Sequence, residues 1–225
     1  MIIRSSADVG NDGIKCLIYG RSGVGKTPTL ATSPTPIILS GEKGLLSIKR
    51  CNPPVPYIEF TNYKELCDAY SWASNSHEAR QFYTIGLDSL TEVSDVILAK
   101  EIPKGNAHGR AYGETYNQVL TLVRAIQNIQ GHSVIVVAKE EYDTDTSTGT
   151  KIFQPAFPGN KLGQATPYFF DETFRMLVGK DSTGKDVRYF RTRLSATEAA
   201  RDRSGMLDEF EPANLTYIFK KILGI

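Results

Sequence analysis

The residues best suited to binding a ligand lie near the start of the chain, between apolar residues at 16–19 and 30–31. The stretch consists of Gly20, Arg21, Ser22, Gly23, Val24, Gly25, Lys26 and Thr27. It fits the pattern G-x-x-x-x-G-K-[ST], known as Walker A, in a strand–loop–helix context. Its glycines allow backbone N–H groups to converge on a phosphate. Pro28 is also assigned to the site, in the first turn of the expected helix, where a missing N–H is tolerated.

Two side chains of this stretch would contact a nucleotide or its metal directly. Lys26 would neutralise the β- and γ-phosphates of ATP, and the Thr27 hydroxyl would coordinate Mg²⁺. A second Mg²⁺ ligand follows the apolar strand expected at 82–87, which leads into Asp88. A carboxylate in that position is typical of Walker B, in which it holds the metal beside the Walker A threonine. The expected cofactors are therefore ATP and Mg²⁺.

The group that activates water must come from elsewhere, because Asp88 is followed by Ser89 and not by the glutamate of many AAA-type motors. Glu42 is the candidate for this role. It follows the second expected strand, at the carboxyl edge of the sheet, where α/β sites assemble. A carboxylate there would orient water toward the γ-phosphate. The alternative is that Glu42 is an ordinary solvated side chain beside Lys43.

Alternating strands and helices would bring these side chains together. Apolar runs predict strands at 14–19, 37–39, 55–60, 82–87 and 134–138, and helical spacing predicts helices at 26–31, 64–73, 90–102, 114–129 and 215–223. Hairpin strands at 174–178 and 187–194 flank a polar turn, and a short strand is expected at 199–201. We therefore expect an α/β fold with a mainly parallel sheet, helices on both faces and antiparallel hairpin strands at the C-terminal edge.

The composition is that of an ordinary globular domain. The 225 residues are 40% hydrophobic and 23% charged, with 26 Lys and Arg against 25 Asp and Glu, so no overall basic charge indicates nucleic acid. The three cysteines lack metal-binding spacing and are expected to be reduced. Without a signal peptide or a long apolar run, we expect a cytoplasmic protein. We assign 1–13 to a polar arm and 14–225 to a single domain.

Four segments together resemble the RecA-type ATPase core: GRSGVGKT at 20–27, IILSGEKGLL at 37–46, YTIGLDS at 83–89 and VIVVAKEE at 134–141. The resemblance covers residues 14–220. More narrowly, the chain is similar to phage-encoded proteins that consist of this core alone and act as single-strand annealing recombinases. Walker A is shared across the whole superfamily, whereas Glu42 and the Asp88–Ser89 pair narrow the resemblance to RecA-like proteins. The resemblance implies a RecA-like ATPase that promotes annealing or recombination.

The resemblance also implies that further copies of the chain complete the site. RecA-like filaments hold ATP between protomers, and a pair of basic residues reaches it from the neighbouring subunit. Arg201 and Arg203 match that pair, and arginine suits the role because it is a fixed bidentate donor for phosphate. The alternative is surface charge balanced by Asp202. Lys139, at the end of the fifth strand, takes the place of the γ-phosphate sensor, where RecA itself has an amide.

Two loops of RecA-like proteins hold single-stranded DNA, and here they are expected at 103–113 and 139–163. The candidate DNA-contacting residues are Lys104, His108, Arg110, Lys151, Phe153 and Lys161. The cations would follow phosphates, and the phenyl ring would stack on a base. The second loop, with a hairpin near 147–149, also carries carboxylates at 140, 141, 143 and 145, which would repel DNA. Single-stranded DNA is thus the expected partner, and a single-strand binding protein is a further candidate.

Three other interpretations stay open. A small-molecule kinase would use the same phosphate loop, but 139–163 has no arginine that could form a lid over a phosphate donor. A non-hydrolysing module would bind ATP only to order an assembly surface. An AAA-type motor fits less well, because of Ser89 and because no helical lid domain is evident.

Overall fold

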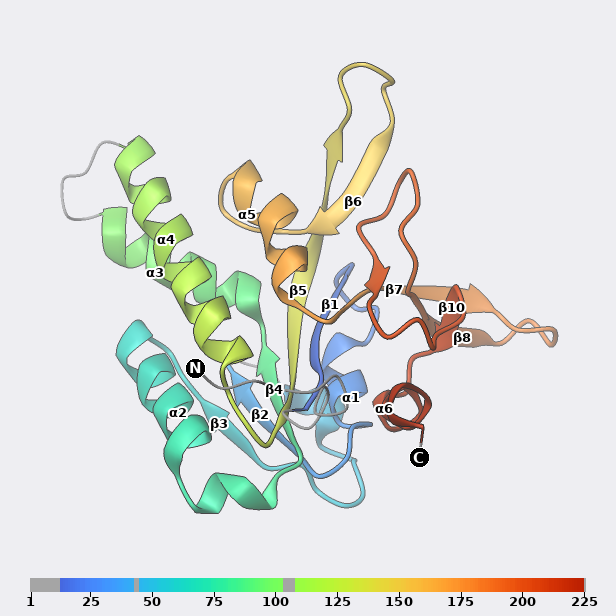
Figure 1. Ribbon diagram of the computed structural model, residues 1–225, viewed down its shortest axis with the longest axis horizontal. Helices are drawn as coiled ribbons and strands as arrows, with labels where there is room; N and C mark the ends of the chain where they lie inside the picture. Colours follow the sequence, from blue (N-terminus) through green and yellow to red (C-terminus); the bar gives the residue numbers. More distant parts are fainter. Residues whose placement is uncertain (1–12, 43–44, 103–107, 225) are drawn as a thin grey trace, which may run out of the picture.

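The computed structural model describes residues 13–42, 45–102 and 108–224, and its strands form one sheet with the order β10-β8-β7-β1-β5-β4-β2-β3 (Figure 1). The strands are β1 (Lys15–Gly20), β2 (Pro36–Ser40), β3 (Tyr57–Glu59), β4 (Thr84–Asp88), β5 (Ser133–Thr144), β6 (Lys151–Pro155), β7 (Glu172–Lys180), β8 (Asp186–Arg191), β9 (Arg201–Asp202) and β10 (Phe210–Pro212). The α-helices are α1 (Lys26–Leu30), α2 (Tyr63–Asn75), α3 (Leu90–Glu101), α4 (His108–Gln127), α5 (Asn160–Ala165) and α6 (Leu215–Leu223). Short 3₁₀ turns are η2 (Leu45–Ile48), η3 (Glu78–Gln81) and η5 (Thr166–Phe169).

The sheet is mainly parallel, as the sequence predicts. Strands β3, β2, β4, β5, β1 and β7 all run in the same direction. Antiparallel pairing begins at the C-terminal side, where β8 pairs with β7 and β10 with β8, while β9 pairs with β7 and β6 with β5. This is the architecture expected from the sequence, a mainly parallel sheet extended by antiparallel hairpin strands at one edge.

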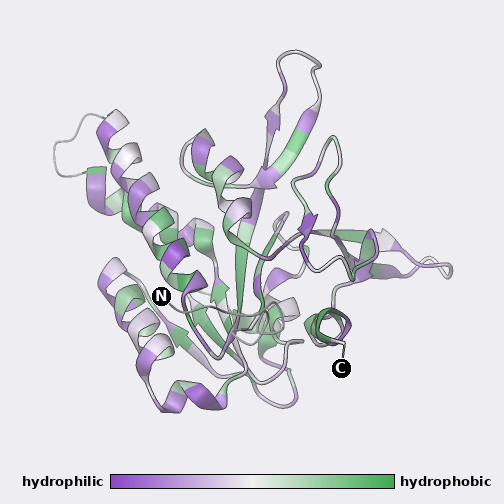
Figure 2. Cartoon of the chain, viewed as in Figure 1, coloured by the Kyte–Doolittle hydropathy of each residue, from purple (hydrophilic) through white to green (hydrophobic). Residues whose placement is uncertain are grey.

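The two faces of the sheet are covered by different helices, and alternation along each strand decides which residue meets which face. Leu17 and Tyr19 belong to the core under α2, α3 and α4, whereas Cys16 and Ile18 belong to the core under α1 and α6. The central strands are accordingly apolar on both faces, and polar residues gather on the outer surfaces of the helices (Figure 2). No helix within the described ranges is long and apolar enough to cross a membrane.

Helix α4 begins earlier than its sequence pattern suggests. The sequence predicts a loop over 103–113, but the structure has helix from His108 onward. Residues 103–107, including Lys104, lie outside the described residues. The helical stripe extends back from Val119 through Thr115 to Ala111, each fully buried at spacings of four residues. Glycines at 109 and 113 hid this continuation, since glycine is normally unfavourable inside a helix.

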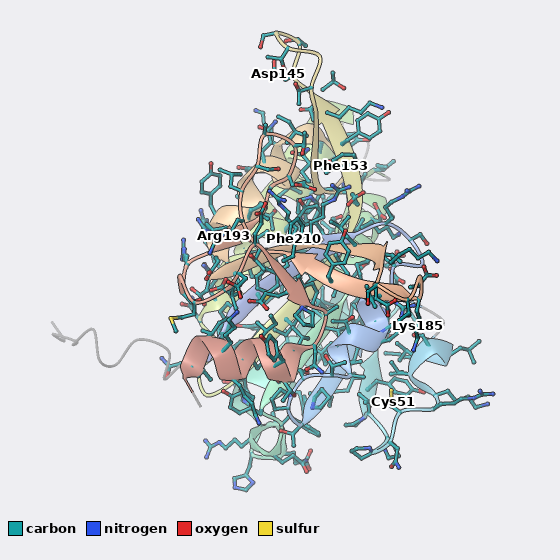
Figure 3. The ribbon with its side chains drawn as sticks, turned by 90° about the vertical axis from the view of Figure 1, so that its right-hand side faces the viewer. Cys51, Asp145, Phe153, Lys185, Arg193 and Phe210 are labelled. Atoms are coloured by element: carbon teal, nitrogen blue, oxygen red, sulfur yellow. The ribbon has the colours of Figure 1, made fainter. Side chains whose placement is uncertain are left out.

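The prediction of a long loop at 139–163 is also wrong for most of these residues. Strand β5 continues to Thr144 and pairs with β6, so the segment is a hairpin followed by α5. The turn near 147–149 is confirmed, and Asp145 at its tip accepts hydrogen bonds from the N–H and hydroxyl of Ser147 (Figure 3). The hairpin projects beyond the body of the sheet (Figure 1). Its polar residues lack the apolar signal of a buried strand because both faces approach solvent there.

Candidate nucleotide site

The site lies at the carboxyl edge of the parallel strands. In the sheet register, Gly20 of β1 is level with Lys139 of β5, and Asp88 of β4 is level with Ser40 of β2. The N–H of Gly41 donates to the carbonyl of Asp88 at 2.8 Å, which fixes the ends of these two strands against each other. The phosphate loop, the Asp88 strand and the Glu42 segment therefore open on the same edge, where ligands of α/β folds bind.

The phosphate loop curves around the side chain of Lys26. The ammonium group donates to the carbonyls of Gly20 and Arg21 at 2.7 and 3.0 Å. Burial lowers the pKa of Lys26, and this outweighs the opposing effect of Asp88 and Glu42. At the lip of the loop Arg21, Ser22 and Gly23 are exposed, whereas Val24 is buried; Pro28 lies within α1. The loop thus presents a cation inside a ring of backbone groups.

Thr27 and Asp88 are in direct contact, as expected for the two metal ligands. The Thr27 hydroxyl donates to Asp88 Oδ2 at 2.6 Å. The Asp88 side chain is buried, and this burial raises its pKa, while the Thr27 hydroxyl lowers it and the nearby Glu42 raises it further. The buried Asp88 carboxylate and the Thr27 hydroxyl supply oxygen donors, the type that Mg²⁺ prefers. These residues therefore fit a Mg²⁺–nucleotide complex.

Glu42 lies beside Asp88 and is held by Ser89. The Ser89 hydroxyl donates to Glu42 Oε1 at 3.1 Å, and the Ser40 hydroxyl donates to the Glu42 backbone carbonyl at 3.0 Å. Ser89 is also the N-cap of α3, where its oxygen accepts a hydrogen bond from the N–H of Glu92. The serine that replaces the usual glutamate therefore orients the glutamate contributed by another strand.

Lys139 closes the same edge on the side of α3. Its ammonium group forms an ion pair with Glu92 at 3.2 Å, and its backbone N–H donates to the Thr91 hydroxyl. Burial is the largest single effect on the pKa of Lys139 and acts to lower it. The nearby carboxylates, led by Glu92, together outweigh burial, so the pKa is raised. The structure brings the Lys26–Thr27 pair together with Glu42, Asp88 and Lys139, which come from separate segments of the sequence.

Arg188 is a residue at this site that the sequence analysis does not identify. It comes from β8, and its Nε donates to the carbonyl of Val24 at 2.8 Å across 164 positions of sequence. Gly25 has a φ of 105°, and a Cβ there would lie 2.6 Å from Arg188 Nε. Only glycine suits both demands. No local pattern could reveal Arg188, because only the pairing of β7 with β8 places it against the loop.

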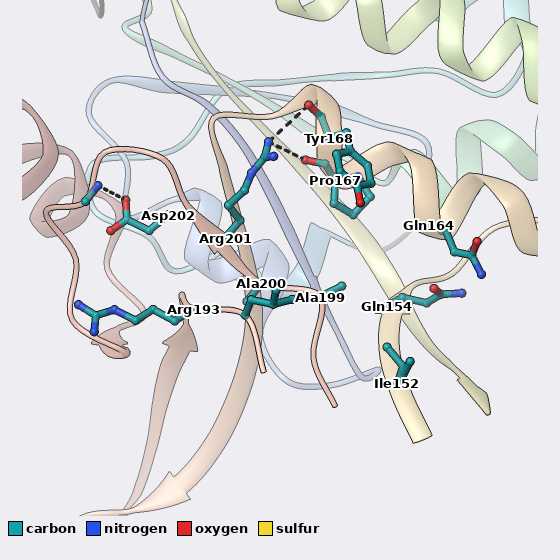
Figure 4. Close-up of a pocket in the computed structure, with 13 residues that line it drawn as sticks. Ile152, Gln154, Gln164, Pro167, Tyr168, Arg193, Ala199, Ala200, Arg201 and Asp202 are labelled. Atoms are coloured by element: carbon teal, nitrogen blue, oxygen red, sulfur yellow. Dashed lines mark hydrogen bonds between the residues drawn. The ribbon is translucent and has the colours of Figure 1, made fainter. Parts of the chain in front are cut away.

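Arg201 and Arg203 lie away from the phosphate loop of their own chain. Arg201 is on β9, which pairs with the start of β7, whereas the loop follows the end of β1. The Arg201 guanidinium donates to the carbonyls of Pro167, Tyr168 and Phe170, and lines a pocket of about 680 Å³ (Figure 4). Burial lowers the pKa of Arg201, and Arg203 beside it acts in the same direction.

The residues predicted to contact DNA are dispersed over several elements. Arg110 is exposed on α4, Lys161 is exposed on α5, and the side chain of His108 lies outside the described residues. On the hairpin, Lys151 Nζ lies 4.3 Å from the centre of the Tyr142 ring. The Arg175 guanidinium covers one face of Phe153 at 3.7 Å, so that face is not available to a base.

Glu140, expected among the carboxylates that would repel DNA, is instead part of a buried ion-pair network. Its carboxylate accepts from Arg175 Nε and Nη2 at 2.8 and 3.2 Å. Arg175 also pairs with Glu198 at 2.8 Å, and Glu198 pairs with Arg191 at 3.1 Å. Arg191 also pairs with Glu209 at 2.7 Å, so Glu140 and Glu198 are compensated by two guanidiniums within a network of three carboxylates. Only Glu141, Asp143 and Asp145 contribute acidic charge to its outer part.

The fold and the site define a P-loop ATPase domain of AAA type. A family model described as "AAA domain" matches residues 12–204. The chain belongs to this family. Ser89 counted against an AAA-type motor in the sequence analysis; the match shows that Ser89 does not separate the chain from AAA domains. A search of curated proteins finds no match.

Two solved structures are similar to parts of this chain. An ATPase from the type III secretion system of pathogenic bacteria is 16% identical, with a TM-score of 0.46, over 73% of this chain and 52% of that one. The chain thus spans about half the length of the secretion ATPase. A KaiC-like protein from Pyrococcus horikoshii OT3 is 10% identical, with a TM-score of 0.46, over 80% of this chain and 78% of that one.

Proposed function

We propose that the protein binds ATP with Mg²⁺ and hydrolyses it. The observation that carries this proposal is the convergence of Thr27, Asp88, Ser89 and Glu42 beside the Lys26 ammonium. Mg²⁺ held by Thr27 and Asp88 would neutralise developing charge on the phosphates. Lys26 contributes positive charge to the same phosphates.

Glu42 is the residue that we assign to activation of water. Ser89 fixes one of its carboxylate oxygens, so the side chain is oriented before a water molecule arrives. The carboxylate then accepts the proton of the water that attacks the γ-phosphate. Lys139, paired with Glu92, contributes a cation at the γ-phosphate end of the site. The closeness of these side chains at the carboxyl edge of the sheet supports the proposed roles.

The test is release of inorganic phosphate from ATP with Mg²⁺, alongside binding of a fluorescent ATP analogue. Glu42→Gln should keep nucleotide binding and lose about 100-fold or more in turnover, as expected for a general base. Lys26→Ala should lose binding as well. Lys64→Ala and Glu59→Gln, both at exposed positions, are matched controls that should behave as wild type. Substantial turnover that Glu42→Gln leaves unchanged would contradict this role. Near-zero turnover in the wild type and in Glu42→Gln, together with tight ATP binding, would favour a module that uses ATP only for assembly.

We further propose that the ATPase works as an oligomer on single-stranded DNA and promotes annealing. The resemblance to RecA-like proteins supports this, as does the projecting hairpin with Lys151 and Tyr142 on it. Arg201 and Arg203 lie far from the phosphate loop of their own chain, which suits a role at the site of a neighbouring copy.

Two measurements test these finer steps. A labelled oligonucleotide should shift at low salt with Mg-ATP, and the double variant Lys151→Ala/Lys161→Ala should weaken the shift; no shift of the wild type would refute the DNA role. Mixing Lys26→Ala with Arg203→Ala, each inactive alone, should restore part of the turnover, because one mixed interface keeps both groups. No recovery at any mixing ratio would contradict a shared site.

A further inference from the structure

Arg188 is anchored at one atom and free at the others. Its Nε is committed to the carbonyl of Val24, and its guanidinium carbon lies 3.4 Å from the position that a Cβ on Gly25 would take. Among the described residues, no hydrogen bond or ion pair engages its two Nη nitrogens. The guanidinium therefore presents N–H donors and a planar face beside the phosphate loop, in an orientation fixed by the Nε contact.

The sheet order shows which part of a nucleotide this group would meet. Asp88 ends β4 and Glu42 follows β2, and both strands lie on one side of β1. Arg188 is on β8, on the opposite side of β1. The phosphate loop follows β1 and lies between Arg188 on one side and Asp88 and Glu42 on the other. A triphosphate whose metal-bound end is directed toward Asp88 and Glu42 has its nucleoside end on the side of β7 and β8.

We propose that Arg188 holds the nucleoside part of the bound nucleotide, in contact with the base and the ribose. This inference rests on the proposed binding of ATP and assigns to β8 the recognition of the part that the phosphate loop does not reach. A guanidinium stacks on flat π-systems and donates hydrogen bonds to hydroxyl and ring acceptors. Its anchoring to Val24 reduces the entropy that the side chain loses when a ligand binds.

The experiment compares two ligands that differ only in the nucleoside: Mg-ATP and Mg-tripolyphosphate. Binding of each is measured by titration calorimetry with the wild type, Arg188→Ala, Arg188→Lys and the control Lys185→Ala, which lies in the exposed turn between β7 and β8 (Figure 3). We expect Arg188→Ala to weaken ATP binding about tenfold and tripolyphosphate binding by less than about twofold. Lysine keeps the positive charge but lacks the planar guanidinium, so Arg188→Lys should also bind ATP weakly.

Three results would overturn this role for Arg188 while leaving ATP binding in place. Equal weakening of both ligands in Arg188→Ala would mean that the side chain only supports the loop. Normal ATP binding by Arg188→Lys would mean that positive charge alone matters, and normal binding by Arg188→Ala would mean that there is no contact. Failure of the wild type to bind Mg-ATP would instead refute the proposed function, and this inference with it.

Discussion

Glu172→Gln is expected to stabilise the protein at alkaline pH and to leave it nearly unchanged under acid conditions. Glu172 begins β7, opposite Asp202 of β9, and its side chain is only 1% exposed. Its Oε1 accepts from the N–H of Ser204 at 3.2 Å, while its buried Oε2 has no hydrogen-bond partner among the described residues. Burial, and after it the charge of Asp202, raises the pKa of Glu172 to about 8.

The sign of the pH dependence follows from proton binding in the two states. Between the ordinary pKa of a glutamate and about 8, the folded state keeps a proton that the unfolded state has lost. Stability of the wild type therefore falls as pH rises through this window and levels off above it. The full shift corresponds to roughly 5 kcal/mol. Solvent near the paired β7 and β9 would screen part of this, so we expect Glu172→Gln to gain about 2 kcal/mol at pH 9.

Urea denaturation at pH 5 and pH 9 measures this effect. The difference in unfolding free energy between Glu172→Gln and wild type should grow by about 2 kcal/mol from the lower to the higher pH. Glu59→Gln, on an exposed position of β3, is the control and should give the same small difference at both. A difference for Glu172→Gln that is independent of pH would refute the argument, because it would show that the buried carboxyl is equally protonated in both states.

Three further predictions concern the ion-pair network and the phosphate loop. Arg175→Met leaves Glu140 buried without its cation and should cost about 3–5 kcal/mol in urea denaturation; a loss under about 1 kcal/mol would contradict the network's burial. Gly25→Ala, at a φ of 105° and in conflict with Arg188, should weaken ATP binding about tenfold with little change in Tm; wild-type affinity would show that the loop adapts. Asp88→Asn should make nucleotide affinity the same with Mg²⁺ as with EDTA, and a retained Mg²⁺ effect would exclude Asp88 as a metal ligand.

The positions that the sequence predicts best are those whose signal is local. The phosphate loop is a continuous pattern between a strand and a helix, and Asp88 and Glu42 each follow a buried apolar strand. Because parallel strands end at a common edge, the strand pattern alone is enough to predict that these side chains meet. The hairpin turn near 147–149 and the helix Leu215–Leu223 are local features of the same kind and are confirmed.

The tertiary structure decides what depends on pairing between distant segments. Arg188 reaches the phosphate loop only because β8 pairs with β7. The negative charge of Glu140 is compensated only because Arg175 lies next to it. The early start of α4 depends on burial of Ala111, which its neighbouring glycines conceal. Sequence by itself therefore determines the phosphate-loop pattern and the carboxylates Asp88 and Glu42 at the ends of neighbouring strands, since these follow from local chain geometry. Charge pairing and the surroundings of the nucleotide follow only from contacts across the sheet.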